Sequence, residues 1–155
     1  LSKDFPMLPS SIQHDFEVKP YTRHSGNLAS WLSSGKYAKL YQDDVDYKVS
    51  YKDAVECGLE EDTVQDYEPT LGFAYPFEYE RQYRTNRMDH PKILVIRDSY
   101  CNAIIPYLSP YFRESLFIFD AWRYGANWDI VQKEKPDAVV LMIYEPHIRN
   151  IFRTL

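Results

Sequence analysis

The short apolar run from Ile93 to Ile96 constrains the fold most, because it ends abruptly at the polar pair Asp98-Ser99. A largely β-branched run without polar interruptions is typical of a strand that is covered on both faces. Open parallel sheets bind ligands beyond the carboxyl ends of such strands, so Ser99 lies where chemistry is expected. The alternative is structural, because Asp98 and Ser99 can both accept hydrogen bonds from free N–H groups at a helix start.

Two further apolar runs, at residues 116–120 and 138–144, predict two more buried strands. Between the strands lie helical segments. The first extends to about Phe112 and is broken into pieces by two prolines, and the second covers residues 129–134. Strands that alternate with helices and short connections predict an α/β fold with a parallel sheet and right-handed crossovers.

The part before this core, residues 1–90, is predicted to be irregular and rich in β-structure. Prolines limit regular structure near the start, so only a brief strand is expected at residues 16–18. Residues 45–51 alternate apolar and polar side chains, as half-exposed strands do. The remainder is predicted as three pieces: an acidic surface excursion at 52–64, an edge or irregular strand at 73–83, and a charged loop at 81–90.

Length and charge narrow the class of protein. A chain of 155 residues suits one domain, 1–155, and a first residue of Leu1 rather than methionine indicates part of a longer protein. The net charge is −5 and the basic residues are scattered, which argues against a nucleic-acid partner. No apolar run approaches the roughly 20 residues that cross a bilayer, so no membrane span is expected within the chain.

The potential metal ligands do not have the spacing of a metal site. Cys57 and Cys101 are too few for a disulfide framework, and we expect them not to be bonded to each other. Cys101 is interpreted as a small buried side chain in a packed turn. The acidic trio Asp43, Asp44 and Asp46 lacks the glycine turn and the final glutamate of a calcium loop. No metal and no cofactor is therefore predicted.

Residues 95–108, Val-Ile-Arg-Asp-Ser-Tyr-Cys-Asn-Ala-Ile-Ile-Pro-Tyr-Leu, resemble the nucleophile block of SGNH (GDSL-like) esterases and acyltransferases. The likeness is greatest to DHHW-type proteins and to relatives of the alginate O-acetylation machinery, and it extends roughly from Tyr21 to the C-terminus, as in the C-terminal portion of such proteins. The family's Gly-Asp-Ser or Lys-Asp-Ser reads Arg97-Asp98-Ser99, and its asparagine is Asn102. The resemblance implies a three-layer α/β/α sandwich in which Ser99 attacks an acyl group.

A serine nucleophile also needs a base and an oxyanion hole. Asn102 and the backbone amides that follow Ser99 are the expected donors, although Asn102 is equally well interpreted as a turn or capping residue. His147 follows the third strand, and Glu145 before it imitates an acid-x-His pair or is simply a structural family residue. His24 is the second candidate base.

A third candidate base lies outside the chain. Residues 25–32 resemble the segment that follows the catalytic Asp-x-His of DHHW-type proteins, and this alignment places the base before Leu1. Arg97 beside the nucleophile is expected to form a salt bridge to an acid such as Asp120, and the alternative is that it holds a carboxylate or an acetyl-donor group.

The resemblance implies an acyl-ester enzyme outside the cytoplasm, in the periplasm or at the cell surface. Its substrate would be a cell-surface or secreted polysaccharide, to which it adds or from which it removes O-acetyl groups, with a membrane protein as acetyl donor. The alternative is a non-catalytic glycan-binding or assembly domain that keeps the fold without the base.

Overall fold

The computed structural model describes residues 3–6, 8, 16–23, 44–52, 56–63, 65–69, 76–120, 127–145 and 148. The chain divides into two compact units. One consists of Gln13–Lys52, and the other combines Leu1–Ile12 with Asp53–Leu155. None of the helices in the described ranges is long and apolar enough to cross a membrane.

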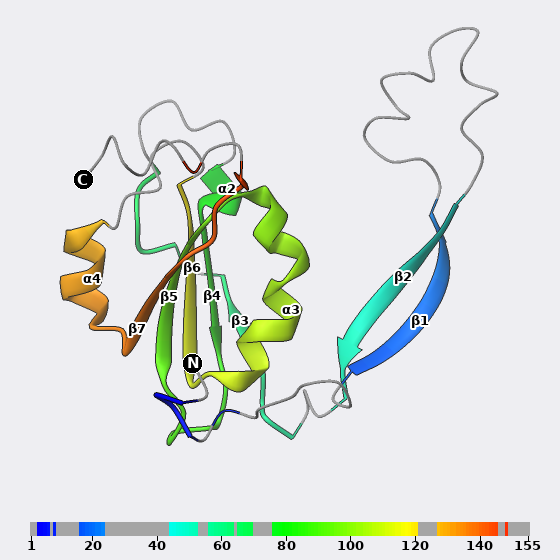
Figure 1. Cartoon of the computed structure of the whole chain (residues 1–155), viewed down its shortest axis with the longest axis horizontal. Coiled ribbons are helices and arrows are strands. Elements are labelled where there is room, and N and C mark those ends of the chain that lie inside the picture. Colours follow the sequence, from blue (N-terminus) through cyan, green and yellow to red (C-terminus); the bar gives the residue numbers. More distant parts are fainter. Residues whose placement is uncertain are drawn as a thin grey trace, which may run out of the picture. The chain divides into compact units, whose positions relative to one another are not determined.

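A five-stranded sheet forms the centre of the larger unit (Figure 1). Its strands lie in the order β3 (Glu60–Asp62), β4 (Glu80–Arg84), β6 (Glu114–Phe119), β5 (Lys92–Arg97) and β7 (Ala138–Leu141). β5 runs parallel to both β6 and β7, as the sequence predicts. β4 pairs antiparallel with β6, and β3 with β4. The sheet is therefore mixed: the three strands predicted for the core are parallel, and β3 and β4, from the part predicted to be irregular and rich in β-structure, extend it in antiparallel pairing.

The core lies on the two central strands. Leu94 is opposite Leu116 and Ile96 opposite Ile118, and all four side chains are at most 1% exposed. Ile130 packs against them from the helix α4 (Trp128–Glu134). Burying a side chain of this size stabilises the folded state by about 1.5–3 kcal/mol, so these contacts hold the sheet to the helix.

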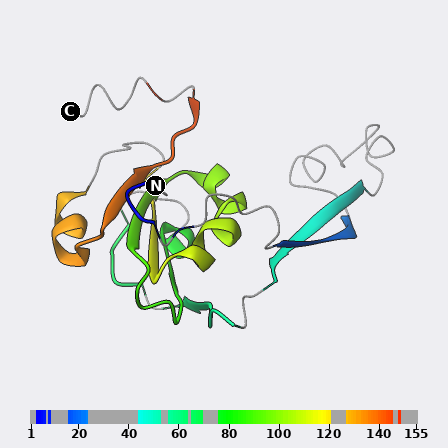
Figure 2. The same cartoon turned by 60° about the horizontal axis from the view of Figure 1, so that its bottom comes forward.

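The connections between the parallel strands cross both faces of the sheet. β5 leads to β6 through η2 (Ser99–Ala103), α3 (Ile105–Leu108) and η3 (Ser109–Tyr111), with a proline in the first turn of the last two, as predicted. β6 leads back across β5 to β7 through α4. Right-handed crossovers in opposite directions require opposite faces. Figures 1 and 2 accordingly show α3 and α4 on opposite sides of the sheet.

The largest correction to the sequence prediction concerns β4. Residues 73–83 were expected to form an edge or irregular strand and 81–90 a charged loop. Instead, the single turn α2 (Pro76–Tyr79) leads into β4, which lies inside the sheet between β3 and β6. The burial of β4 cannot be recognised from hydrophobicity, because two of its buried residues are polar: Glu80 is 4% and Gln82 6% exposed. Glu80 Oε2 accepts hydrogen bonds from the backbone of Asp66 and Tyr67 at 2.7 and 2.9 Å.

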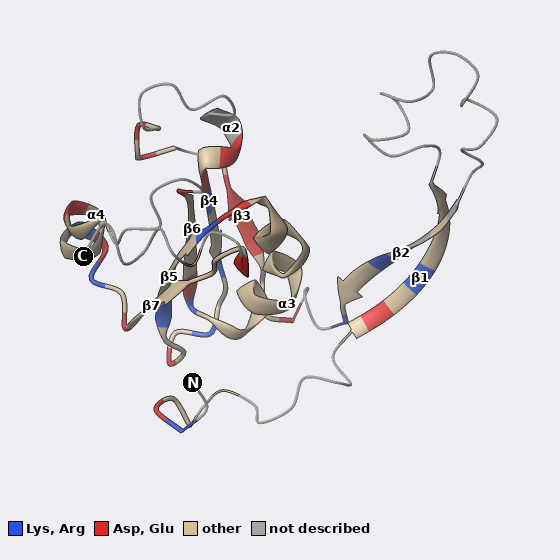
Figure 3. Ribbon diagram, turned by 45° about the horizontal axis from the view of Figure 1, so that its top comes forward, with Lys and Arg blue, Asp and Glu red and all other residues tan. Residues whose placement is uncertain are grey.

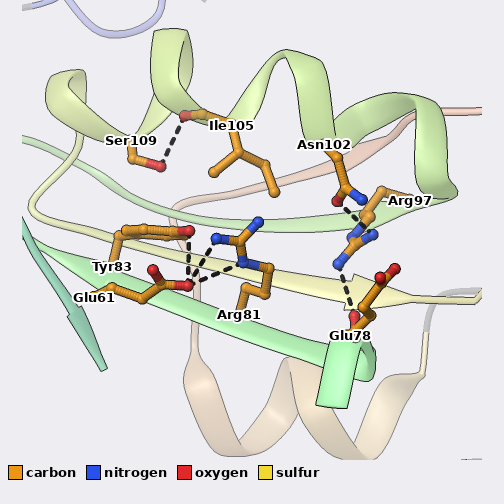
Figure 4. A network of polar contacts seen from close by, with 8 residues as sticks. All are labelled: Glu61, Glu78, Arg81, Tyr83, Arg97, Asn102, Ile105 and Ser109. Carbon is orange, nitrogen blue, oxygen red and sulfur yellow. Dashed lines mark hydrogen bonds and ion pairs between the residues drawn. The ribbon is translucent and has the colours of Figure 1, made fainter. Parts of the chain in front are cut away.

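β3 lies within the predicted surface excursion, and its acidic side chains form ion pairs with basic side chains of β4. Its three residues are acidic and are red in Figure 3. Arg81 donates to Glu61 at 2.8 Å, and the Tyr83 hydroxyl donates to the same carboxylate at 2.9 Å (Figure 4). Arg84 pairs with Asp62 at 3.4 Å. Exposed cross-strand pairs of this kind each contribute about 0.2–1 kcal/mol, which suits a short edge strand.

The smaller unit is an antiparallel pair of strands, β1 (Phe16–Arg23) and β2 (Asp44–Tyr51). β2 confirms the predicted half-exposed strand, since Val45 and Tyr47 are exposed whereas Tyr51 is buried. β1 is longer than the predicted residues 16–18 and continues through a proline. The short helix expected within residues 28–32 falls outside the described residues.

Candidate functional site

The candidate site lies where β5 and β7 end. The chain leaves β5 towards β6, while β7 lies on the other side of β5. Neighbouring parallel strands whose connections diverge in this way leave a crevice at their carboxyl ends, where α/β sheets bind ligands. A pocket of about 290 Å³ occupies this position. Its lining comes from both strand ends: Asp98, Tyr100, Cys101, Ile104, Met142, Ile143, Tyr144 and Glu145.

Ser99 is the first residue of η2, directly after β5 and between two residues that line the pocket. Its side chain is exposed. Neither its hydroxyl nor its backbone N–H is hydrogen-bonded to any residue that the structure describes. The structure thus places Ser99 where the sequence predicted it, at the carboxyl end of the first core strand and accessible to solvent.

Asp98, unlike Ser99, caps the helical turn that follows β5, which was the alternative interpretation of Asp98 and Ser99. It is 6% exposed and caps η2, with Oδ1 accepting from the Tyr100 N–H at 2.8 Å. Oδ2 accepts from the Tyr144 N–H at 2.9 Å. This carboxylate therefore ties the turn after β5 to the segment after β7, and it holds the two sides of the pocket together. The sequence gives no sign of this link, because the two residues are 46 positions apart.

The Asn102 side chain is oriented by Arg97. The Arg97 Nη1 donates to Asn102 Oδ1 at 2.9 Å (Figure 4). A guanidinium offers only donors, so the amide must present its oxygen to Arg97 and keep its Nδ2 donors for another partner. That amide nitrogen is not hydrogen-bonded within the described part of the chain. Asn102 thus lies in the turn η2 with its amide oriented by Arg97, three positions after Ser99.

Arg97 itself is fully buried, at 0% exposure. Its Nη2 donates to the Glu78 carbonyl at 2.7 Å, and its guanidinium lies 4.7 Å from the Phe119 ring centre. Burial lowers the pKa of Arg97, and the nearby charge of Arg81 lowers it further. The expected salt bridge from Arg97 to Asp120 is not formed within the described residues, where the guanidinium contacts Asn102 and the Glu78 carbonyl instead. The alternative, that Arg97 holds a carboxylate or an acetyl-donor group, stays a prediction.

The two backbone amides that were predicted as oxyanion donors are already hydrogen-bonded. The Tyr100 N–H donates to the Asp98 carboxylate, and the Cys101 N–H donates to the Asp98 carbonyl at 3.2 Å. In this turn, the Asn102 side-chain N–H groups and the Ser99 backbone N–H have no hydrogen-bond partner among the residues that the structure describes.

Cys101 lies under the turn and is 1% exposed, as predicted. Burial raises its pKa to about 11, so the reactive thiolate is scarce at neutral pH. Its Sγ approaches Met142 Sδ at 3.3 Å. Cys57 is also buried, and the two cysteines are not bonded to each other, which confirms that prediction.

Tyr100 and Tyr144 form a feature of the site that the sequence analysis missed. Their rings stack at 5.0 Å with an interplanar angle of 11°. Both belong to the pocket lining, one after β5 and one after β7. The available signal was a tyrosine directly after Ser99 and another as the last residue of the predicted strand at 138–144.

The base stays unassigned, because His147 and His24 both lie outside the described residues. His90 is the one histidine that the structure describes, and its Nδ1 lies 2.8 Å from the Tyr111 carbonyl. It precedes β5, whose six residues span about 20 Å, so it is far from Ser99. No group of three His, Cys, Asp or Glu residues in the described ranges could hold a metal ion.

Solved structures of similar fold exist, although no protein-family model and no curated protein sequence matches the chain. A DHHW family protein from Eubacterium siraeum DSM 15702 has a TM-score of 0.58 and 13% identity, over 89% of this chain and 50% of that one. PatB1 from Bacillus cereus, with a sulfonyl adduct, has a TM-score of 0.59 and 14% identity, over 90% of this chain and 50% of that one. The chain therefore shares the fold of these proteins and spans about half of their length.

Proposed function

We propose that this chain provides the nucleophile of a serine-dependent acyl-ester enzyme of the SGNH type. Ser99 is the nucleophile, and Asn102 and the Ser99 N–H are the oxyanion donors. One observation carries the proposal: an exposed serine at the end of β5 lies three residues before an asparagine whose amide is oriented by a buried arginine. The SGNH three-layer arrangement is part of the same proposal.

The chemistry follows from these positions. A base removes the Ser99 proton as the hydroxyl oxygen attacks the acyl carbonyl, and the new oxyanion receives hydrogen bonds from Asn102 and the Ser99 N–H. The alcohol leaves with a proton from the base, and the acyl group remains on Ser99. Water or a sugar hydroxyl then takes the acyl group. Because Arg97 already holds the amide, little reorganisation is needed when the charge develops.

The substrate class rests on the resemblance of residues 95–108 and on the similar folds. We propose O-acetyl transfer to, or removal from, a cell-surface or secreted polysaccharide outside the cytoplasm, with a membrane protein as acetyl donor. The DHHW family protein and PatB1 support the choice of family, and the sulfonyl adduct of PatB1 suggests a reagent for testing this chain. Sulfonyl fluorides react with activated nucleophiles, so they can test Ser99 without knowledge of the glycan.

A second candidate function is a glycan-binding or assembly domain without catalysis. One observation favours it. Both carboxylate oxygens of Asp98 are already bonded to backbone N–H groups, so this acid has a structural role beside Ser99.

The two candidates are separated by turnover of 4-nitrophenyl acetate by the chain and its Ser99→Ala, His147→Ala and His24→Ala variants. We expect slow turnover that depends on Ser99, because a serine with an oxyanion hole but without its base retains only residual catalysis. Rapid turnover that His147→Ala or His24→Ala abolishes would assign the base to that histidine. Slow turnover unaffected by either histidine would place the base outside the chain. Equal turnover by Ser99→Ala and the unmodified chain would replace the enzyme with the binding domain.

A further inference from the structure

We propose that the pocket beside Ser99 is an acyl-chain site, which accepts the hydrocarbon chain of an ester longer than acetate. The inference rests on the proposed function, because it places the acyl carbonyl at Ser99, and it changes one part of that proposal, the acyl group, from acetyl to a longer acyl group. The pocket measures about 290 Å³, and the methyl group of an acetyl ester would fill a small part of it.

The chemistry of the lining favours a hydrocarbon. Ile104, Met142 and Ile143 contribute apolar side chains, and the stacked rings of Tyr100 and Tyr144 form one flank. Three of these side chains also remain substantially exposed: Tyr100 at 68%, Tyr144 at 42% and Ile104 at 38%. A chain that covered them would remove apolar surface from water, which is the main source of binding free energy in such sites.

The charged groups of the lining make sugars and anions poor ligands for this pocket. Asp98 has both oxygens occupied by the N–H groups of Tyr100 and Tyr144. Glu145 is exposed and would repel an anion. A sugar ring brings several hydroxyl groups, and each costs free energy if it is buried without a partner. A polysaccharide substrate would therefore lie outside this pocket, with only its acyl group directed inward.

The position of the pocket relative to Ser99 determines how the hydrocarbon part of the ester would lie. Asp98 and Tyr100, the residues on either side of Ser99, both line the pocket, whereas Ser99 and Asn102 do not, so the pocket lies beside these two residues rather than around them. The proposal places the ester carbonyl at the Ser99 hydroxyl and the carbons that follow it in this neighbouring pocket. Burying one CH₂ contributes about 0.8 kcal/mol, which corresponds to about fourfold in kcat/KM. Because the pocket is open to solvent, we expect about two- to fourfold per CH₂.

The first experiment compares 4-nitrophenyl acetate, butanoate and hexanoate as substrates. We expect kcat/KM to rise with chain length, and Ile104→Trp to lower the ratio of hexanoate to acetate turnover because the larger ring fills the pocket. Met88→Trp is the matched control, since Met88 is 72% exposed in the turn before β5, and it should keep the ratio of the unmodified chain. A ratio that does not rise with chain length, or that Ile104→Trp leaves unchanged, would overturn the proposal.

The second experiment does not depend on catalysis. Backbone amide NMR shifts of the Ser99→Ala variant are followed during titration with hexanamide or acetamide. Hexanamide should shift the signals of Tyr100, Ile104 and Tyr144, with much smaller shifts from acetamide. If hexanamide shifts none of them, the acyl-chain site is wrong even where Ser99 turns over esters. If hexanamide binds there and no ester is turned over, the proposed function fails while the acyl-chain site stands.

Discussion

The amino and carboxyl ends of β5 differ in how their polar groups are paired. At the amino end, the Lys92 Nζ donates to Glu114 and Glu134 at 2.8 and 2.7 Å, and the Tyr67 hydroxyl donates to Glu134. At the carboxyl end, the Ser99 hydroxyl has no partner among the described residues, and Arg97 is buried with its Nε unbonded. The charged side chains at the amino end of β5 are therefore paired with one another, although the neighbouring Ser115 hydroxyl on β6 is buried without a partner, whereas the Ser99 hydroxyl and the Arg97 Nε at the carboxyl end are unpaired among the described residues.

The difference indicates what each end contributes. Lys92 and Glu134 side chains are both 13% exposed, so their charges are held by each other rather than by water. Burial alone lowers the pKa of Lys92, but its hydrogen bonds to Glu114 and Glu134 outweigh that effect and raise it. Polar groups that are buried or aligned without a partner cost stability, and they persist where they serve a ligand. The amino end is thus expected to set stability and the carboxyl end to set activity.

The largest effect is expected at the carboxyl end. Ser99→Ala should abolish the Ser99-dependent turnover of 4-nitrophenyl acetate, because the nucleophile is removed. The melting temperature should stay within about 1 °C, since an exposed serine without hydrogen bonds contributes little to stability. A large loss of stability, measured by thermal unfolding, would show that the two ends are not separated as described.

Lys92→Met tests the amino end. It leaves the largely buried Glu134 without the ammonium group of Lys92, and Glu114 with only Arg113 at 4.0 Å, so we expect the free energy of unfolding to fall by about 2–4 kcal/mol. Turnover per folded molecule should be unchanged. Lys19→Met is the matched control, because the Lys19–Glu17 pair is exposed and should cost less than about 0.5 kcal/mol. Similar losses for both variants in urea unfolding would contradict the account.

Asn102→Ala and Arg97→Lys test whether the arginine acts through the amide. Removing one oxyanion donor costs about 10²-fold in kcat, so we expect this loss for Asn102→Ala with little change in KM. Arg97→Lys should lower kcat by about tenfold, because a single ammonium group cannot reproduce both Nη contacts. In the Asn102→Ala background, Arg97→Lys should have no further effect on kcat. Additive losses would give Arg97 a different role.

The smallest effects concern two carboxylates whose pKa values shift in opposite directions. Burial raises the pKa of Glu134, but its hydrogen bonds to Lys92 and Tyr67 outweigh burial, so the pKa is lowered overall. The ionised Glu134 therefore stabilises the fold at a pH above its unfolded-state pKa. This stabilisation is lost as the pH falls through its folded-state pKa. Burial raises the pKa of Glu80, so folding is favoured as the pH falls towards that raised value.

Replacing each carboxylate by an amide tests whether the pKa values of Glu134 and Glu80 shift in opposite directions. In urea unfolding at pH 7, Glu134→Gln should destabilise the chain, and Glu80→Gln should be neutral or stabilising by up to about 1 kcal/mol, since Glu80 Oε1 is buried without a partner. The difference between the two variants should shrink at acid pH. Equal effects of the two variants at every pH would contradict the pKa directions.

Sequence reasoning succeeded where burial coincides with apolar side chains. The run at residues 93–96 became β5, and the runs that begin near Leu116 and Ala138 became β6 and β7. The prolines correctly divided the helical segment between β5 and β6. These features are local, so a pattern of neighbouring residues contains them.

The parts that failed depend on contacts between distant residues. β4 was missed because Glu80 and Gln82 are polar, and Glu80 is satisfied by the backbone of a loop 13 and 14 residues away. The role of Arg97 was missed because a buried arginine that orients an amide looks, in sequence, like any arginine beside an acid. The link from Asp98 to Tyr144 exists only once β7 lies beside β5.

Covalent labelling with phenylmethylsulfonyl fluoride tests the central claim, that Ser99 is a nucleophile at an oriented oxyanion site, most directly. The peptide from Asp98 to Arg113 is sequenced by mass spectrometry after digestion with trypsin, with exposed Ser50 as the internal control. The account predicts a sulfonyl adduct on Ser99 that forms slowly, as expected without an assigned base, but faster than on Ser50 because the oxyanion donors remain. The adduct should be absent from Ser99→Ala and slower to form in Asn102→Ala. No adduct on Ser99, or labelling of Ser99 no faster than that of Ser50, would contradict it.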